Sequence, residues 1–133
     1  MNIPAQFIVV DDDPINNMVC KYTISNIIPE VNVQLFTDPE QALASIKTQY
    51  DEGTMQPETV LFLDINMPIM SGWEFLDELS TFPENLRSHI TIYILSSSID
   101  PEDIADAERH PYVHGYHSKP LSKETLKQIC KID

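Results

Sequence analysis

The sequence predicts an α/β fold built on a doubly wound, five-stranded parallel sheet with strand order 2-1-3-4-5 and five helices. The first supporting observation is that five stretches with strand character alternate with five stretches of helical character along the 133 residues. Connections of this length imply parallel strands joined by right-handed crossovers. The second is that the first, third and fourth strands are the most apolar, which puts them in the middle of the sheet and the other two at its edges.

The strand expected at the centre is Val60–Leu63, a run of four apolar residues that is typical of a strand buried on both faces. Chemistry in an open parallel sheet sits beyond the carboxyl ends of the strands, so Asp64, the next residue, is expected at the floor of a crevice. An Asp that merely begins a loop is the alternative interpretation at this point. Ser71 and Glu74 have the spacing of a capping box, which predicts a helix from about Gly72 to Ser80.

Two helices in the first half of the chain are predicted by the same start signal, an Asp followed by a Pro. Asp caps a helix well, and Pro fits its first position. The alternating pattern of the second strand indicates a half-exposed strand at a sheet edge. The elements expected here are a strand Gln6–Val10, a helix from Pro14 to about Ile28 with Ile15, Met18, Val19, Tyr22 and Ile27 at helical spacing, a strand Val31–Phe36, a helix from Asp38-Pro39 to near Tyr50, and a loop over 51–57.

The second half of the chain continues the alternation. Thr81–Ser88 is polar and contains a proline, so a loop is expected there. The elements expected after it are a strand Ile90–Leu95, a helix that begins at Asp100-Pro101, a short weak strand Tyr112–His117, and a final helix capped by Ser122 and carrying Leu126 and Ile129. His114 and His117 are three apart on the weak strand, which would put them on opposite faces and argues against a zinc site.

Composition narrows the class of protein. The formal net charge is −13, with eight Lys and Arg against 21 Asp and Glu, and no basic stripe is available for direct nucleic-acid binding. No apolar run approaches the roughly 20 residues of a membrane span, and the start has no features of a signal peptide, so a cytoplasmic protein without membrane contact is expected. Cys20 and Cys130 are expected to be reduced and buried. We expect residues 1–133 to form a single domain.

Polar residues follow four of the expected strands: Asp11 and Asp12, Asp64, Ser96, and Lys119. In the predicted sheet these ends converge on one crevice. Crowded carboxylates repel one another unless a cation neutralises them, and magnesium suits one or two carboxylates plus waters and a phosphate. With a lysine charge and a serine hydroxyl added, the site can hold a phosphoryl group on a carboxylate. Asp64, the only carboxylate at the end of the central strand, is the predicted nucleophile.

These residues make the chain resemble the receiver domain of two-component response regulators, the CheY-like domains of flavodoxin-like fold, over nearly its whole length. The matching motifs are Val9-Val10-Asp11-Asp12, Leu63-Asp64-Ile65-Asn66-Met67-Pro68 running to Gly72, Ile94-Leu95-Ser96, and Lys119-Pro120. The resemblance implies that Asp64 accepts a phosphoryl group from a histidine kinase. It also implies a site for Mg²⁺, or for Mn²⁺ in its place, whose ligands would be Asp11, Asp12, Asp64 and the Asn66 backbone carbonyl.

The same resemblance implies roles around the phosphoryl group. Ser96 occupies the position of the switch residue, Tyr116 that of the aromatic side chain that turns inward on activation, and Lys119 that of the family's lysine. Asn66 and Ser98 occupy positions that tune dephosphorylation, and we expect Ser98 to guide the attacking water less than an acidic or amide residue would. The implied partners are a histidine kinase, a histidine phosphotransfer protein or both, and a downstream protein target.

Two other interpretations compete with a receiver. An aspartate-nucleophile phosphatase of the haloacid dehalogenase type would need a second Asp two residues after the nucleophile, where this chain has Asn66. A pseudo-receiver that only binds protein would lack the acidic pair, the nucleophile or the lysine, all of which are present. The sequence therefore favours a signalling receiver without an output domain in this chain, and not an enzyme beyond catalysing its own phosphorylation and slow dephosphorylation.

Overall fold

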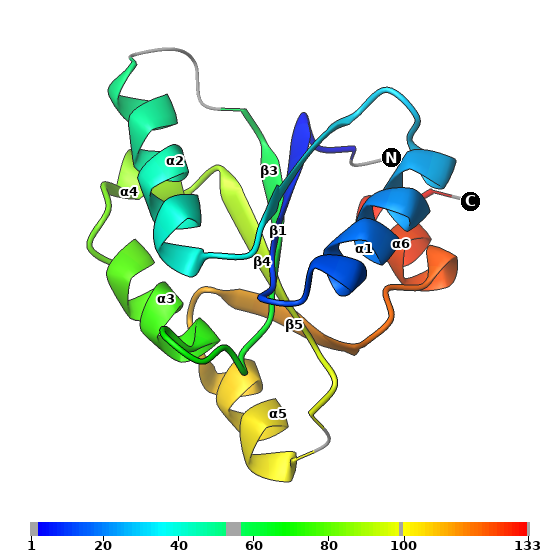
Figure 1. Cartoon of the computed structure of the whole chain (residues 1–133). Helices are drawn as coiled ribbons and strands as arrows, with labels where there is room; N and C mark the ends of the chain where they lie inside the picture. The colour runs from blue at the N-terminus through cyan, green and yellow to red at the C-terminus, as the bar shows by residue number, and fades with distance from the viewer. Residues whose placement is uncertain (1–2, 53–56, 99, 133) are drawn as a thin grey trace.

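The computed structural model describes residues 3–52, 57–98 and 100–132, and its parallel sheet has the order β2-β1-β3-β4-β5 (Figure 1). The strands are β1 (Gln6–Val10), β2 (Asn32–Phe36), β3 (Thr59–Leu63), β4 (Ile90–Ser96) and β5 (Val113–Ser118). The helices are α1 (Pro14–Ile27), α2 (Pro39–Asp51), α3 (Gly72–Leu79), α4 (Glu84–Arg87), α5 (Pro101–Arg109) and α6 (Lys123–Cys130). The predicted fold class and strand order are confirmed. Part of the loop expected over 51–57 lies outside the described residues.

The sheet separates two hydrophobic cores, one on each face. Figure 1 shows the helices that cover the two faces. Helices α2, α3 and α5 close the core that contains Leu61 and Ile94, and helices α1 and α6 close the core that contains Phe7 and Phe62. Every residue of β1 and β3 is buried, whereas β2 and β5 at the sheet edges are partly exposed. This difference in burial explains why the central strands are continuous apolar runs and the edge strands are not.

The predicted helix starts form as expected. Asp13, Asp38 and Asp100 are the N-cap residues of α1, α2 and α5, and each carboxylate accepts a hydrogen bond from the backbone N–H two residues later. A proline occupies the first turn of all three helices. At α3 the capping box is complete, because Ser71 Oγ accepts from the Glu74 N–H and Glu74 Oε1 accepts from the Ser71 N–H. These caps satisfy backbone donors that a helix leaves unpaired at its start.

The prediction of a loop over Thr81–Ser88 is wrong, because this stretch contains the short helix α4. The described residues therefore form six helices where five were predicted. Pro83 precedes the helix as its N-cap residue and does not interrupt it. Leu86, in the middle of α4, is buried in the core beside α2 and α3. Because α4 is only one turn long, one buried side chain and a proline at its start are enough to determine that this stretch forms a helix.

His114 and His117 of β5 both lie close to Tyr93 of the neighbouring strand β4. The rings of both histidines lie beside the Tyr93 ring, with centroid distances of 6.2 and 5.7 Å. Ile92 pairs with Val113 but Tyr93 pairs with Gly115, so β5 carries one extra residue at this point. Such a bulge shifts the alternation of side chains by one position.

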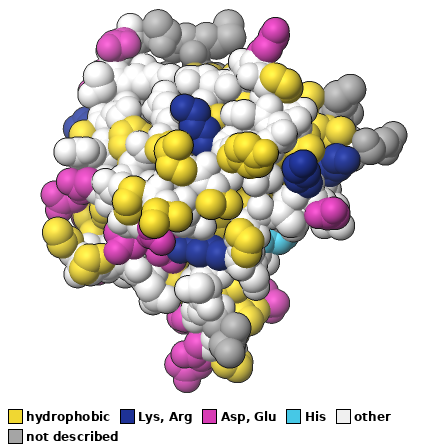
Figure 2. Space-filling model, turned by 45° about the vertical axis from the view of Figure 1, so that its right-hand side comes forward, with side chains coloured by type: hydrophobic (Ala, Val, Ile, Leu, Met, Phe, Trp, Pro, Cys, Tyr) yellow, Lys and Arg dark blue, Asp and Glu magenta, His cyan; other side chains and the backbone are white. Residues whose placement is uncertain are grey.

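Helix α1 exposes four of its apolar residues to solvent. Ile15, Met18 and Tyr22 are 73%, 61% and 71% exposed, and Val19 is 39% exposed. The residues that α1 buries against the sheet are Asn17, Cys20, Thr23 and Ile24. Together with Pro14, the exposed residues line one shallow apolar groove, which we call the α1 stripe (Pro14, Ile15, Met18, Val19 and Tyr22). Figure 2 is turned so that the side of the molecule with α1 and α6 comes forward, and it shows hydrophobic side chains on that face.

Both cysteines are free and buried, as predicted. Burial, followed by the nearby Asp11 carboxylate, raises the pKa of the Cys20 thiol to about 12, so this thiol stays protonated at neutral pH and is a poor nucleophile. Of the helices described, none is long and apolar enough to cross a bilayer.

Candidate functional site

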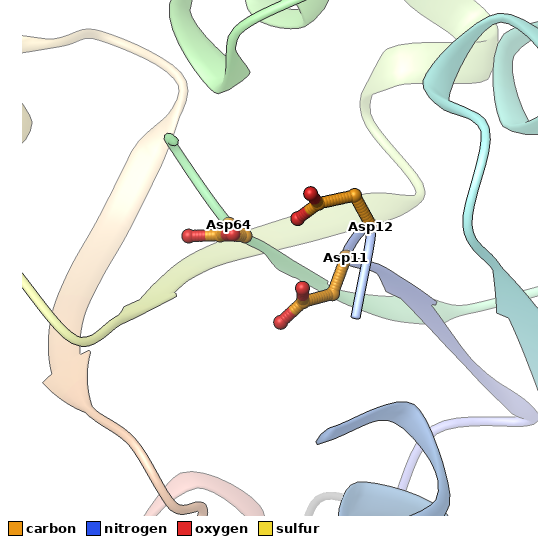
Figure 3. Close-up of side chains that lie close together, drawn as sticks. All are labelled: Asp11, Asp12 and Asp64. Carbon is orange, nitrogen blue, oxygen red and sulfur yellow. The ribbon is translucent and has the colours of Figure 1, made fainter. Parts of the chain in front are cut away.

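Two neighbouring strands bring three acidic residues together. Val10 at the end of β1 pairs with Leu63 at the end of β3, so the residues that follow, Asp11 and Asp64, are neighbours at the carboxyl edge of the sheet. The Asp64 N–H donates to the Val10 carbonyl at 3.0 Å and extends the ladder by one step. Asp11, Asp12 and Asp64 each offer a carboxylate oxygen within 4.8 Å of the others, and Figure 3 shows them at the ends of the two strands. We call them the acidic cluster.

Two members of the acidic cluster are buried. Asp11 is 1% exposed and Asp64 is 5% exposed, whereas Asp12 faces solvent. Lys119 Nζ lies 2.6 Å from Asp11 Oδ2 and 3.4 Å from Asp64 Oδ2. The lysine follows β5, and its backbone N–H donates to the Ser96 carbonyl at 3.0 Å, which holds it against the end of β4. Two buried carboxylates therefore share one ammonium group, and the cluster keeps a net negative charge.

Titration of the site reflects this shortage of positive charge. Burial raises the pKa of Asp64 above its ordinary value, the Lys119 charge opposes that rise, and the Asp11 carboxylate adds to it. Burial lowers the pKa of Lys119, but the hydrogen bond that Lys119 donates to Asp11 and the charges of Asp64 and Asp11 outweigh burial and leave that pKa raised. Lys119 is therefore a fixed cation at neutral pH, and Asp64 is a carboxylate whose charge is costly without further neutralisation.

Two asparagines on α1, which are not among the residues predicted from the sequence, also contact the cluster. Asn16 Nδ2 donates to Asp11 Oδ2 at 2.7 Å. Asn17 Nδ2 donates to the backbone carbonyls of Asp11 and Phe36, at 3.1 and 3.2 Å, and its side chain is buried. Both lie in the first turn of a helix that begins directly after the acidic pair. An amide at that place in the sequence is the signal that could have identified them.

The predicted switch residues are linked through the loop that follows β4. Ser96 is fully buried, and its Oγ accepts a hydrogen bond from the Ser98 N–H at 3.1 Å. The Tyr116 hydroxyl donates to the Ser98 carbonyl at 2.6 Å. Ser98 Oγ donates to Asp103 at the start of α5, at 2.7 Å. Ser98 thus has its backbone groups and its hydroxyl bonded to protein, and its side chain is tied to α5.

Gly72 lets the loop after β3 pack tightly against α3. Its N–H donates to the Ile65 carbonyl at 3.1 Å. A Cβ at this position would lie 2.6 Å from the Asp64 carbonyl oxygen and 2.8 Å from the Ile65 Cα, and both are backbone atoms that cannot swing away. The glycine therefore fixes the backbone that carries Asp64. The Asn66 N–H, two residues on, lies 3.4 Å from Asp64 Oδ1.

The donor set fits a hard divalent cation. Within residues 3–52, 57–98 and 100–132, the acidic cluster is the one group of three or more His, Cys, Asp or Glu side chains close enough to share a metal ion. All three ligands are carboxylates, the type that Mg²⁺ and Mn²⁺ prefer, and Asp12 keeps one side of the cluster open to solvent. His114 and His117 do not belong to such a group.

Comparison with known proteins shows similarity to response regulators. A family model described as the response regulator receiver domain matches residues 7–131. The cyclic di-GMP phosphodiesterase response regulator RpfG of Xanthomonas campestris pv. campestris (strain 8004) is 31% identical over 97% of this chain, and the chain spans 32% of that protein's length.

Solved structures agree. A two component response regulator from Cytophaga hutchinsonii has a TM-score of 0.82 and 31% identity, covering 93% of this chain and 92% of its own. A response regulator receiver protein from Dyadobacter fermentans DSM 18053 has a TM-score of 0.84 and 27% identity, covering 95% of this chain and 94% of its own.

Proposed function

The chain belongs to the response regulator receiver domain family, and from that premise we propose that it is a phosphorylatable receiver in which Asp64 accepts a phosphoryl group from a phosphohistidine. The observation that carries this proposal is the pair formed by Asp64 of the acidic cluster and Lys119 beside it, with Lys119 Nζ 3.4 Å from Asp64 Oδ2. A buried carboxylate beside a fixed cation can hold an added phosphoryl group whose charge would otherwise be too costly.

In the proposed transfer, a carboxylate oxygen of Asp64 attacks the phosphorus of the donor. The new P–O bond forms as the P–N bond to the donor histidine breaks. The electron pair of the broken bond stays on the ring nitrogen, and a ring that was protonated leaves as neutral imidazole. The product is an acyl phosphate. Lys119, now paired with Asp11 and Asp64, is in reach of the oxygens that develop charge.

Mg²⁺, or Mn²⁺, would be held by Asp11, Asp12, Asp64 and the Asn66 backbone carbonyl. When bound, the cation neutralises charge on the carboxylates and on the phosphoryl oxygens. The protein contributes the fixed geometry: Asp11 is oriented by the Asp13 N–H, which donates to its Oδ1 at 2.9 Å, and Asp64 by the backbone that Gly72 packs against.

We further propose that phosphorylation changes the surface formed by α5, β5 and α6. The acyl phosphate adds about −1.5 to −2 charges at Asp64 and attracts the Ser96 hydroxyl. Ser96 is bonded to Ser98, and Ser98 is bonded to Tyr116 and to Asp103 of α5, so a shift of Ser96 disturbs both. The change is a population shift between two packed arrangements, which a downstream protein target reads.

The α1 stripe is the surface that we propose for docking of the phosphodonor, a helix of a histidine kinase or of a histidine phosphotransfer protein. Pro14 of the stripe lies two residues after Asp12, so an occupant of the stripe reaches the acidic cluster. Ile15, Met18, Val19 and Tyr22 follow the spacing by which one helix packs against another. A second copy of this chain is a poor occupant, because two chains of net charge −13 repel each other. Contacts with nucleic acid or membrane are not part of the proposal, and the cytoplasm is the proposed location.

The experiment is incubation of the purified protein with acetyl phosphate and Mg²⁺, followed by intact mass measurement. We expect addition of one phosphoryl group in the wild type, none in Asp64→Asn, and none when a chelator removes the cation. Asp38→Asn, which removes a helix cap outside the cluster, is the matched control and should accept phosphate like the wild type. Phosphorylation that persists in Asp64→Asn would contradict the proposed function.

A further inference from the structure

We propose that Asn16 is a positioning residue that keeps the Asp11 carboxylate in place when Lys119 leaves Asp11 for the phosphoryl group. The inference rests on the proposed function and adds to it a residue that is outside the expected site. Its basis is that one oxygen of a buried carboxylate has two side-chain donors. Asp11 Oδ2 accepts from Lys119 Nζ at 2.6 Å and from Asn16 Nδ2 at 2.7 Å.

Lys119 can pair either with Asp11 or with a group at Asp64. In the unphosphorylated protein its ammonium group lies closer to Asp11, at 2.6 Å, than to Asp64, at 3.4 Å. A phosphoryl group on Asp64 would bring strong acceptor oxygens and about −1.5 to −2 charges to the second side. The lysine is then drawn from Asp11 toward that group, and the Asp11 carboxylate loses its shortest hydrogen bond.

Loss of that hydrogen bond is costly at Asp11 because the residue is 1% exposed, so water cannot replace the lost donor. A buried charge without sufficient donors destabilises the state that contains it. Asn16 Nδ2 remains on Oδ2, and the Asp13 N–H remains on Oδ1 at 2.9 Å. Asn16 is therefore the side chain that lowers the cost of the lysine's departure.

The adjacent Asn17 shows that the two amides have separate tasks. Asn17 binds the backbone carbonyls of Asp11 and Phe36 and so fixes the chain between β1 and α1. Asn16, which is half-buried in the same helical turn, donates to the carboxylate itself. Loss of Asn17 would act through the fold, whereas loss of Asn16 would act on the charge balance of the site.

The test is calorimetric titration of Asn16→Ala and Asn16→Asp with Mg²⁺ alone and then with beryllofluoride at saturating Mg²⁺. Beryllofluoride is the probe for the phosphoryl group. We expect beryllofluoride affinity to fall about tenfold in Asn16→Ala, while Mg²⁺ affinity changes less than about threefold, because the lost donor matters most when Lys119 has moved. Asn16→Asp has the same shape but no amide donor, so it should lose at least as much affinity for beryllofluoride.

Asn26→Ala is the matched control, since Asn26 is an exposed asparagine on α1 whose side-chain amide donates to the Tyr22 carbonyl. It should bind both probes like the wild type, and urea unfolding shows whether each variant is folded. Equal losses for Mg²⁺ and beryllofluoride, or no loss for either, would overturn the inference. A wild type that binds Mg²⁺ but not beryllofluoride would instead contradict the proposed function.

Discussion

The acidic cluster and the α1 stripe lie next to each other in the sequence, and both depart from the usual rule that charged side chains are exposed and apolar side chains are buried. The cluster buries charge: Asp11 and Asp64 are almost inaccessible to water. The stripe exposes apolar surface: Ile15 and Tyr22 are more than two-thirds exposed, while the same helix buries Asn17 and Thr23. Only one residue, Asp13, separates Asp12 from Pro14 in the sequence. Two departures from ordinary folding at one edge of the sheet indicate where function has been placed above stability.

The two departures differ in their cost. Buried carboxylates are unfavourable unless donors or cations surround them, so the cluster is held by many specific contacts. Exposed apolar side chains cost little singly, but a continuous group of them is typical of an interaction site. The cluster should therefore be sensitive to any change of geometry. The stripe should tolerate substitution in the isolated protein and show its importance only with a partner.

The largest effect is expected for Asp64→Asn, which replaces a buried carboxylate of the cluster by a neutral amide. Phosphorylation should be abolished. In the absence of divalent cations this variant should also be more stable than the wild type, because burial raises the Asp64 pKa and a raised carboxyl pKa lowers stability at neutral pH. Thermal unfolding in chelator should show a melting temperature higher by a few degrees, the size that about 1 kcal/mol produces in a domain of this length. A lower melting temperature would mean that the Asp64 charge is well compensated without metal.

Gly72→Ala tests the rigidity of the cluster side. The new methyl group would overlap the Asp64 carbonyl and the Ile65 Cα, so the backbone must move. We expect a loss of roughly 2–4 kcal/mol in the free energy of unfolding, measured with urea, and weaker Mg²⁺ binding. Gly115→Ala is the control, since its methyl group would meet the Tyr93 side chain at 3.1 Å and a side chain can give way. Similar losses in both variants would contradict the special role of Gly72.

Met18→Gln and Tyr22→Ser test the stripe side. Each side chain is largely exposed, so we expect the free energy of unfolding to change by less than about 0.5 kcal/mol. Transfer from a cognate phosphohistidine donor should slow about tenfold, as for lost contacts of about 1.4 kcal/mol, while phosphorylation by acetyl phosphate stays unchanged. Ile24→Asn, on the buried face of the same helix, should instead destabilise the fold by several kcal/mol. Unchanged transfer in both stripe variants would remove the stripe from the docking surface.

The smallest effect is expected for His117 on β5, which belongs neither to the acidic cluster nor to the α1 stripe. Burial lowers the pKa of His117 below its ordinary value, so the folded protein favours the neutral ring. The neutral His117 ring contributes stability that is fully present above the unfolded pKa of about 6.5 and is lost as pH falls through the lower folded pKa. Urea unfolding of His117→Gln should therefore show a shallower loss of stability on acidification than the wild type. His114→Gln removes an exposed histidine from the same strand and controls for surface charge. An equal flattening in that variant would contradict the assignment to His117.

The sequence predicts most of this fold because the strands differ so clearly in apolar content. Val60–Leu63 and Gln6–Val10 fixed the centre of the sheet, and the ends of parallel strands must meet at one edge, which brings Asp11 and Asp64 together. Periodicity identified α1 but not which side of it faces the core, because Asn17, Cys20 and Thr23 are too small or polar to mark a buried face.

Two further features that the sequence did not predict depend on contacts distant in sequence, and a third depends on local geometry. The position of His114 relative to His117 depends on a bulge in the pairing of β5 with β4, which is set by the partner strand. The short helix α4 depends on burial of Leu86 against helices that precede it. The hydrogen bond from Asn16 to Asp11 depends on how α1 leaves the sheet, which spacing alone does not determine.

The most direct test of the central claim, that Asp64 forms an acyl phosphate, is borohydride reduction after phosphotransfer, followed by peptide sequencing. Reduction converts an aspartyl phosphate to homoserine and so records the residue that held the phosphoryl group. The account predicts homoserine at position 64, and only when both Mg²⁺ and a phosphodonor are present. Homoserine at position 11 or 12, or none at any position in folded protein that binds Mg²⁺, would contradict it.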